Sequence, residues 1–370
     1  MHHLPYINTR PLRKALCFLS VTVLMLGSSC NPVQQDGEHL VNLEEVTDDE
    51  EAKLRNLDAA IQRNGQDASL FARRARVLLS KGELEKALKD VDDAIALNEK
   101  NMSYLFLKAH ILRAMHQPAE ALALALKAER NSYQNTALYV LLSDLYLQLK
   151  QPQKAAEVAR KALALDPDNG YAFYFKGRAA AATGDTARAL TNYRLAVTEE
   201  PELLEAQRDL AGALVKQQQL DTARYYLQKV QKQLPKDALV WYYQGMYYQQ
   251  VQKTDSALWS YQKALALADT LQAAHARAGF LMYAKGDYPA AILHFEKAAR
   301  DNNHNIKYIS ALANAYERTG QNINALEQYQ RLAALQPGYG VANYSIARLK
   351  AKLTRPAPVV SQPDTTTITE

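Results

Sequence analysis

The chain has 370 residues, of which 48% are hydrophobic and 22% are charged, and only 14 are glycine. With a mean hydropathy of −0.34, this composition excludes a membrane-embedded body and favours a soluble, helix-rich one with a large buried core. The formal net charge of +5 includes three basic residues between positions 10 and 14 that we expect to be removed. The remaining charge of +2 (5 − 3) is too small to favour a nucleic-acid partner.

Residues 1–29 have the pattern of an N-terminal targeting signal. The basic residues precede an apolar run over positions 15–26, which is too short to cross a bilayer and fits a signal-peptide core. Small residues and then Cys30 follow, and this arrangement resembles a bacterial lipoprotein signal. The resemblance implies that Cys30 becomes the lipidated first residue, while the only other cysteine, Cys17, leaves with the signal. Ordinary secretion with a free Cys30, or an apolar N-terminus unrelated to export, stays open.

Two segments separate this signal from the body of the chain. Residues 30–46 are polar and acidic without apolar periodicity, which predicts a flexible tether. Residues 47–66 are a predicted N-terminal capping helix, opened by Thr47 and by Glu50 three residues later. This is the spacing of a capping box, in which both side chains bond to free backbone N–H groups.

Residues 68–339 contain eight consecutive copies of a 34-residue unit. Each copy shows two stripes of helical spacing separated by a break, as at Gly184, which predicts a helix, a tight turn and a second antiparallel helix. Position 20 of the unit is alanine in all copies: Ala87, Ala121, Ala155, Ala189, Ala223, Ala257, Ala291 and Ala325. Position 8 is small in all copies: Ala75, Ala109, Ser143, Gly177, Ala211, Gly245, Gly279 and Ala313. Small residues at these two positions predict that the two helices approach closely.

The period and the small/large alternation resemble the tetratricopeptide repeat family. The resemblance implies an all-α fold, a right-handed superhelix (α-solenoid) of eight tandem repeats with flanking capping helices. Stacking of neighbouring units then buries the apolar stripes. We expect residues 340–353 to form the C-terminal capping helix, and residues 354–370, rich in proline and threonine, to be a disordered tail.

Residue types suited to catalysis or metal binding are scattered through the sequence. There is no Gly-rich phosphate loop, no nucleophile elbow and no His-Glu-x-x-His spacing. The histidines of the repeats are distributed over several units and are expected to be solvated or packing residues: His110, His116, His275, His294 and His304. The sequence therefore predicts no enzyme, no cofactor and no metal site.

A binding surface is the remaining place for function. In tetratricopeptide superhelices, positions 2, 5, 9 and 12 of each unit line the concave face, and tyrosine, methionine and arginine are enriched where proteins bind partners. The predicted partner-binding groove consists of Tyr171, Tyr174, Arg178, Arg208, Tyr242, Met246, Phe280 and Tyr283. Some of these aromatic residues could instead pack between neighbouring helices.

The leading hypothesis is a non-enzymatic, membrane-tethered adaptor or scaffold that binds a protein or peptide of the cell envelope in this groove. Tetratricopeptide lipoproteins as a group act as assembly and secretion factors. The resemblance implies the cell envelope of a Gram-negative-type bacterium, with the membrane contacted only through the lipid. Asn31, rather than aspartate, after the cysteine favours the outer membrane. A glycan-binding lipoprotein that uses the concave tyrosines is one alternative, and a structural bridge that acts through the convex face is another.

Overall fold

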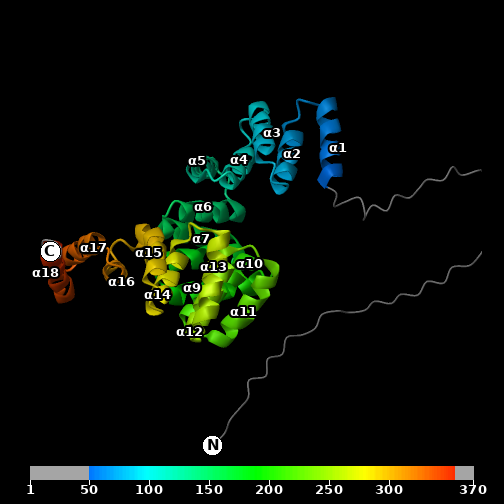
Figure 1. Ribbon diagram of the computed structural model, residues 1–370. Helices are drawn as coiled ribbons and strands as arrows, with labels where there is room; N and C mark the ends of the chain where they lie inside the picture. The colour runs from blue at the N-terminus through cyan, green and yellow to red at the C-terminus, as the bar shows by residue number, and fades with distance from the viewer. Residues whose placement is uncertain (1–49, 355–370) are drawn as a thin grey trace, which may run out of the picture. The chain divides into compact units, whose positions relative to one another are not determined.

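The computed structural model describes residues 50–354 of the chain (Figure 1). The predicted signal, Cys30, the tether, Thr47 of the expected capping box and the proposed tail from residue 355 on lie outside the described residues. The described residues from Lys53 onward belong to a single compact body.

All regular structure between residues 50 and 354 is helical, which confirms the predicted all-α solenoid fold. No helix in these residues is both long and apolar enough to cross a membrane. The helices are α1 (Glu50–Arg63), α2 (Ala68–Ser80), α3 (Leu84–Leu97), α4 (Met102–Ala114), α5 (Pro118–Arg130), α6 (Thr136–Gln148), α7 (Pro152–Leu165), α8 (Gly170–Ala182), α9 (Thr186–Glu199), α10 (Leu204–Lys216), α11 (Leu220–Gln233), α12 (Ala238–Gln250), α13 (Thr254–Leu267), α14 (Gln272–Ala284), α15 (Tyr288–Asn302), α16 (Ile306–Arg318), α17 (Asn322–Leu335) and α18 (Gly340–Thr354).

The helix boundaries follow the period of the sequence repeat. The first helices of the units, α2 to α16 in even numbers, begin one full repeat apart, from Ala68 to Ile306. The second helices, α3 to α17 in odd numbers, keep the same step from Leu84 to Asn322. Each first helix packs against the second helix of its unit. Position 8 of the unit, on the first helix, and position 20, on the second helix, are buried in every copy, because the two helices cross there.

Local chemistry starts and ends these helices. In six units an aspartate or asparagine side chain at the N-cap of the first helix accepts a backbone N–H bond: Asp67, Asn101, Asn135, Asn169, Asp237 and Asn305. The turn inside every unit places its position-15 residue in the left-handed region, with φ between 57° and 84°. Four of these residues are glycine (Gly82, Gly184, Gly286 and Gly320) and four are not (His116, Lys150, Gln218 and Gln252).

The buried apolar residues form a series of clusters along the solenoid rather than one central core. One cluster joins α2 to α4, the next joins α4 to α8, a third joins α8 to α14, and the last joins α15 to α18. Each cluster involves helices that are close in the sequence, so stability depends on contacts between neighbouring units.

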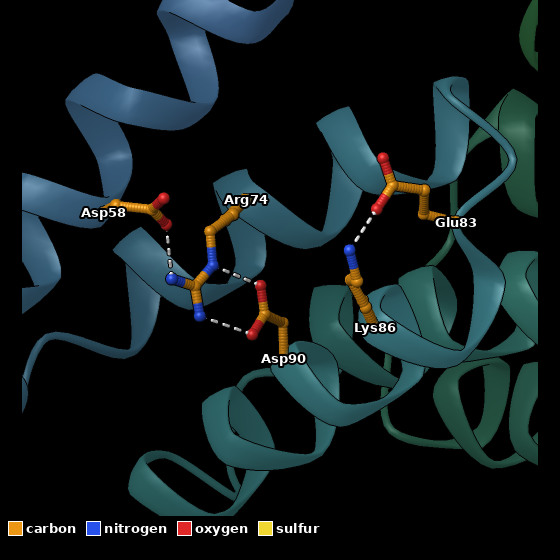
Figure 2. Close-up of polar contacts among 5 residues, drawn as sticks. All are labelled: Asp58, Arg74, Glu83, Lys86 and Asp90. Carbon is orange, nitrogen blue, oxygen red and sulfur yellow. Dashed lines mark hydrogen bonds and ion pairs between the residues drawn. The ribbon is translucent and has the colours of Figure 1, made fainter.

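The two end helices differ in how they attach. In α1 no residue is buried, and its Asp58 accepts a hydrogen bond of 2.7 Å from Arg74 of α2, whose guanidinium also binds Asp90 of α3 at 2.6 Å (Figure 2). At the start of α3, Lys86 donates to Glu83 (Figure 2). At the other end, α18 has Leu349 among its buried residues, in one cluster with α16 and α17.

Candidate functional site

Two hollows in the described residues are lined mainly by first helices. The first, of about 450 Å³, lies among α4, α6, α8 and α10, and we call it the central pocket. The second, of about 1090 Å³, lies among α12, α14, α16 and the end of α15, and we call it the C-terminal groove. Six of the eight residues predicted to bind a partner line one of these hollows. Tyr171, Tyr174 and Arg178 line the central pocket, and Tyr242, Phe280 and Tyr283 line the C-terminal groove, while Arg208 and Met246 line neither.

The wall of the central pocket is an ion network around one carboxylate. Asp144 of α6 accepts from Arg113 of α4 at 3.0 Å and lies 3.5 Å from Arg178 of α8. Burial and the nearby Arg113 cation lower the pKa of His110 to about 4, so this ring is neutral at neutral pH. Asp144 already supplies a counter-charge to both arginines of this pocket, Arg113 and Arg178.

Tyr174 and Arg208 form part of a buried network that joins α8 to α10. The Tyr174 hydroxyl donates to Asp209 at 3.1 Å, and burial together with the Asp209 charge raises the pKa of this tyrosine well above its usual value. Arg208 donates to Asp209 at 2.8 Å and to Asp237 at 2.6 Å. These contacts hold neighbouring repeats together. Met246 is also buried, within the α8–α14 cluster.

The C-terminal groove combines aromatic walls with a floor of small residues. Phe280 packs edge-on against Phe295, and the Tyr283 hydroxyl donates to Asn314 at 2.9 Å, so both rings are held in place. Tyr339, which precedes α18, contributes a further ring. The groove is also lined by small side chains: Ala273, Ala276, Ala284, Ser310 and Ala311.

Two cations face this groove, and neither was predicted. Arg277 of α14 donates to the Tyr242 hydroxyl at 3.3 Å and to the Gln249 side-chain oxygen at 3.1 Å. Lys307 of α16 is exposed and its ammonium lies 5.4 Å from the centre of the Phe280 ring. Within residues 50–354 no carboxylate pairs with Arg277 or Lys307.

Arg277 was missed because it stands at position 6 of its unit, outside the four positions used for the prediction. A signal was nevertheless present in the sequence. In five other units position 6 holds an apolar or aromatic residue: Leu107, Leu141, Phe175, Tyr243 and Ala311. Three units depart from this pattern with a charged residue: Arg73, Asp209 and Arg277. Asp209, at the same position, marks the buried network described above.

Other clusters of reactive side chains offer no metal site. Nδ1 of His275 lies 2.9 Å from Nδ1 of His294, and Nε2 of His275 lies 2.9 Å from the Asp269 carbonyl oxygen. The described residues contain no group of three or more His, Cys, Asp or Glu side chains that could hold a metal ion.

Comparison with known families identifies the repeats. Family models described as tetratricopeptide repeat match residues 136–169 and 180–246. The chain contains tetratricopeptide repeats. Proteins built of such repeats are typically non-catalytic scaffolds that mediate protein interactions. No curated protein matches the chain in sequence.

Solved structures with a similar arrangement of helices share little sequence with this chain. The Cut9–Hcn1 tetramer of the anaphase-promoting complex is 18% identical with a TM-score of 0.60, and the match covers 80% of this chain. The chain spans 58% of the length of that relative. The human IFIT1 dimer with m7Gppp-AAAA is 20% identical with a TM-score of 0.50, and the match covers 77% of this chain and 73% of IFIT1. PilF of Pseudomonas aeruginosa is 20% identical with a TM-score of 0.48, and the match covers 59% of this chain and 97% of PilF. At identities this low, the Cut9–Hcn1 and IFIT1 matches support the fold alone.

Proposed function

We propose that this tetratricopeptide repeat protein is a non-enzymatic adaptor that holds a segment of a partner protein in its C-terminal groove. The observation that carries the proposal is the groove itself, about 1090 Å³ in volume, with rings from α12, α14 and the residue before α18 around a floor of small side chains. A hollow of this kind accepts protruding side chains of an extended segment or a helix. The central pocket is smaller, and its arginines are already paired.

We further propose that the chain acts in the cell envelope, tethered to the outer membrane by a lipid on Cys30. The support is in the sequence: the short apolar run over positions 15–26, the small residues after it, and a cysteine that would be the single thiol of the mature chain. A lipid anchor followed by a polar tether would leave the repeats free to reach partners near the membrane. The partner is then a protein of the same compartment.

Site-specific crosslinking tests the groove as the binding place. A photoreactive amino acid is placed at Ser310 on the groove floor, and in a matched variant at the exposed Glu157 of α7. Each variant is irradiated with envelope extract. We expect an adduct from position 310 that protease digestion of the extract beforehand removes. An adduct that survives protease would favour a glycan ligand, and equal adducts from both positions would show that the groove is not the site.

A bridge through the convex face is the second candidate function, and one observation favours it. Position 22 of the unit is a large, exposed apolar residue in three consecutive repeats: Tyr225, Trp259 and Leu293, which are 62%, 50% and 56% exposed. They lie on the second helices α11, α13 and α15, and none of them lines the C-terminal groove. Exposed apolar side chains that recur in register can mark an interaction surface. If a photoreactive residue at 259 captures a protein and one at 310 does not, this candidate replaces the first.

A further inference from the structure

The side chain of Arg277 is half-buried and has no counter-charge among the described residues. Its Nε and Nη1 atoms donate to neutral acceptors, the Tyr242 hydroxyl and the Gln249 amide oxygen. Removing a guanidinium from water is costly unless an anion compensates it, and neutral hydrogen bonds offset only part of that cost. The groove therefore holds a positive charge that an incoming anion would stabilise.

The other half-buried arginines of the first helices each have a carboxylate partner. Arg74 binds Asp58 and Asp90. Arg208 binds Asp209 and Asp237, and Arg113 and Arg178 share Asp144. In each of these cases the chain itself supplies the carboxylate, whereas for Arg277 it supplies none within residues 50–354.

Lys307 adds a second available cation on the facing helix. Its ammonium lies over the Phe280 ring and has no carboxylate partner among the described residues. The one acidic residue that lines the groove, Asp301, lies 3.5 Å from Arg300. Arg277, Lys307 and Asp301 give the groove lining a net charge of +1 (2 − 1), and Asp301 already lies near the Arg300 guanidinium.

We infer that the C-terminal groove recognises an acidic segment of a polypeptide, whose side-chain carboxylates pair with Arg277 and Lys307 while its apolar side chains pack among Tyr242, Phe280 and Tyr283. This inference rests on the proposed function and adds the chemistry of the ligand. Two cations among aromatic rings suit a few carboxylates spaced along a peptide. They are too few to track the phosphates of a nucleic-acid strand, where affinity comes from many such contacts.

Selection from a random peptide library tests the inference without assuming a ligand. The immobilised protein is the full chain, presented beside its variants Arg277→Gln, Lys307→Gln and a control, Lys285→Gln. Lys285 is an exposed cation just after α14 that pairs with Asp255 and does not line the groove. Each variant is first compared with the parent by circular dichroism and thermal melting, so that loss of fold is recognised.

We expect the parent and Lys285→Gln to enrich acidic peptides with interspersed apolar residues. Replacing the acidic residues of an enriched peptide by glutamine should weaken binding about tenfold or more, and Arg277→Gln should weaken the acidic form by a similar factor. Arg277→Lys, which keeps the charge, should retain part of the affinity. Affinity should also fall as salt rises, and amidation of the peptide C-terminus should leave it unchanged, because the carboxylates belong to side chains.

Several outcomes would overturn the inference. If the enriched peptides are neutral or basic, or if acidic and glutamine forms bind equally, the groove does not select for acidic ligands, although protease-sensitive crosslinking at 310 would still support the proposed function. If amidation abolishes binding, a terminal carboxylate is the ligand. If a single-stranded oligonucleotide binds more tightly than the acidic peptides and Arg277→Gln abolishes its binding, the ligand is a nucleic acid. If no peptide is enriched and no crosslink forms at 310, both proposals fail.

Discussion

A Cβ atom added to Gly177 would lie 2.7 Å from Cδ1 of Tyr193, closer than packed carbon atoms approach. Gly177 is position 8 of its unit on α8, and Tyr193 is position 24 on α9. The same pairing of a glycine with a ring occurs between Gly245 and Tyr261 and between Gly279 and Phe295. In these repeats the missing side chain of the first helix makes room for an aromatic ring of the second.

Overpacking this crossing should destabilise the solenoid. We expect Gly177→Leu or Ala189→Leu to lower the free energy of unfolding by about 1–3 kcal/mol, because the Tyr193 ring or the opposite backbone must move. Neighbouring units are coupled, so the melting curve should broaden as well as shift. Gly338→Ala is the control, since a Cβ there meets nothing within 4 Å. Melting curves for both variants that match that of the parent would contradict the assigned register.

The turn inside each unit allows a paired test of backbone strain. Gly184 and Lys150 both occupy position 15 with positive φ, at 84° and 57°. Gly184→Ala places a Cβ in the left-handed region and should cost about 1 kcal/mol, whereas Lys150→Gly relieves the same strain and should be neutral or slightly stabilising. Urea unfolding of both variants measures the difference. Changes of the same sign would show that side-chain contacts, rather than φ, decide these positions.

Removing Arg208 should be among the most damaging polar substitutions. Asp209 is 7% exposed, and Arg208→Met would remove the ion pair of this carboxylate and leave it the Tyr174 hydroxyl as its remaining side-chain partner within residues 50–354. The expected loss is about 3–5 kcal/mol of unfolding free energy. Arg188→Met is the matched control, because Arg188 forms an exposed pair with Asp185 that should contribute little. Chemical denaturation of both variants gives the comparison, and equal small losses would contradict the role of the buried network.

His110 should make stability depend on pH. Its pKa falls from 6.5 to about 4 on folding, mainly through burial, so between these values the unfolded chain binds more protons. The free energy of unfolding is therefore unaffected by this group above pH 6.5. It decreases by up to about 3 kcal/mol as the pH falls from 6.5 toward 4. Arg113 and Asp144 are the charged groups that influence it.

Urea unfolding across this pH range in wild type and His110→Phe checks the prediction. The variant should lose much of the pH slope, while His304→Phe, at an exposed position, should keep it. An unchanged slope in His110→Phe would show that other groups cause the pH dependence, and His294, whose pKa is also lowered by burial, would be examined next.

The proposed anchor gives a prediction that needs no folded structure. Cys30→Ser should abolish lipid attachment and release the protein from the membrane fraction or leave the signal uncleaved, because no other cysteine would remain in the mature chain. Cys17→Ser, within the signal, should leave attachment intact. Metabolic labelling with a fatty-acid analogue and membrane fractionation measure both. A Cys30→Ser protein that remains as labelled and as membrane-bound as wild type would refute the lipoprotein hypothesis.

The sequence by itself determined the repeating architecture, because the signals for it are local. Alanine at position 20, a small residue at position 8 and a break near position 15 recur in every unit, and the helices begin on that same step. Helix starts depend on nearby caps such as Asn169, and helix pairing depends on small residues within one unit. Such features can be read from one stretch of chain at a time.

The tertiary structure alone decided which side chains remain available to a ligand. Tyr174, Arg208 and Met246 stand at positions expected to face a groove, yet two join buried ion or hydrogen-bond networks and one is in the core. Arg277 stands at a position that is usually apolar, yet it faces the C-terminal groove without a carboxylate partner among the described residues. Whether a charge is compensated depends on residues that other helices supply. Asp237, the N-cap of α12, pairs with Arg208 of α10, whereas Gln249 of α12 gives Arg277 of α14 only a neutral hydrogen-bond acceptor. Those contacts arise only when the units stack.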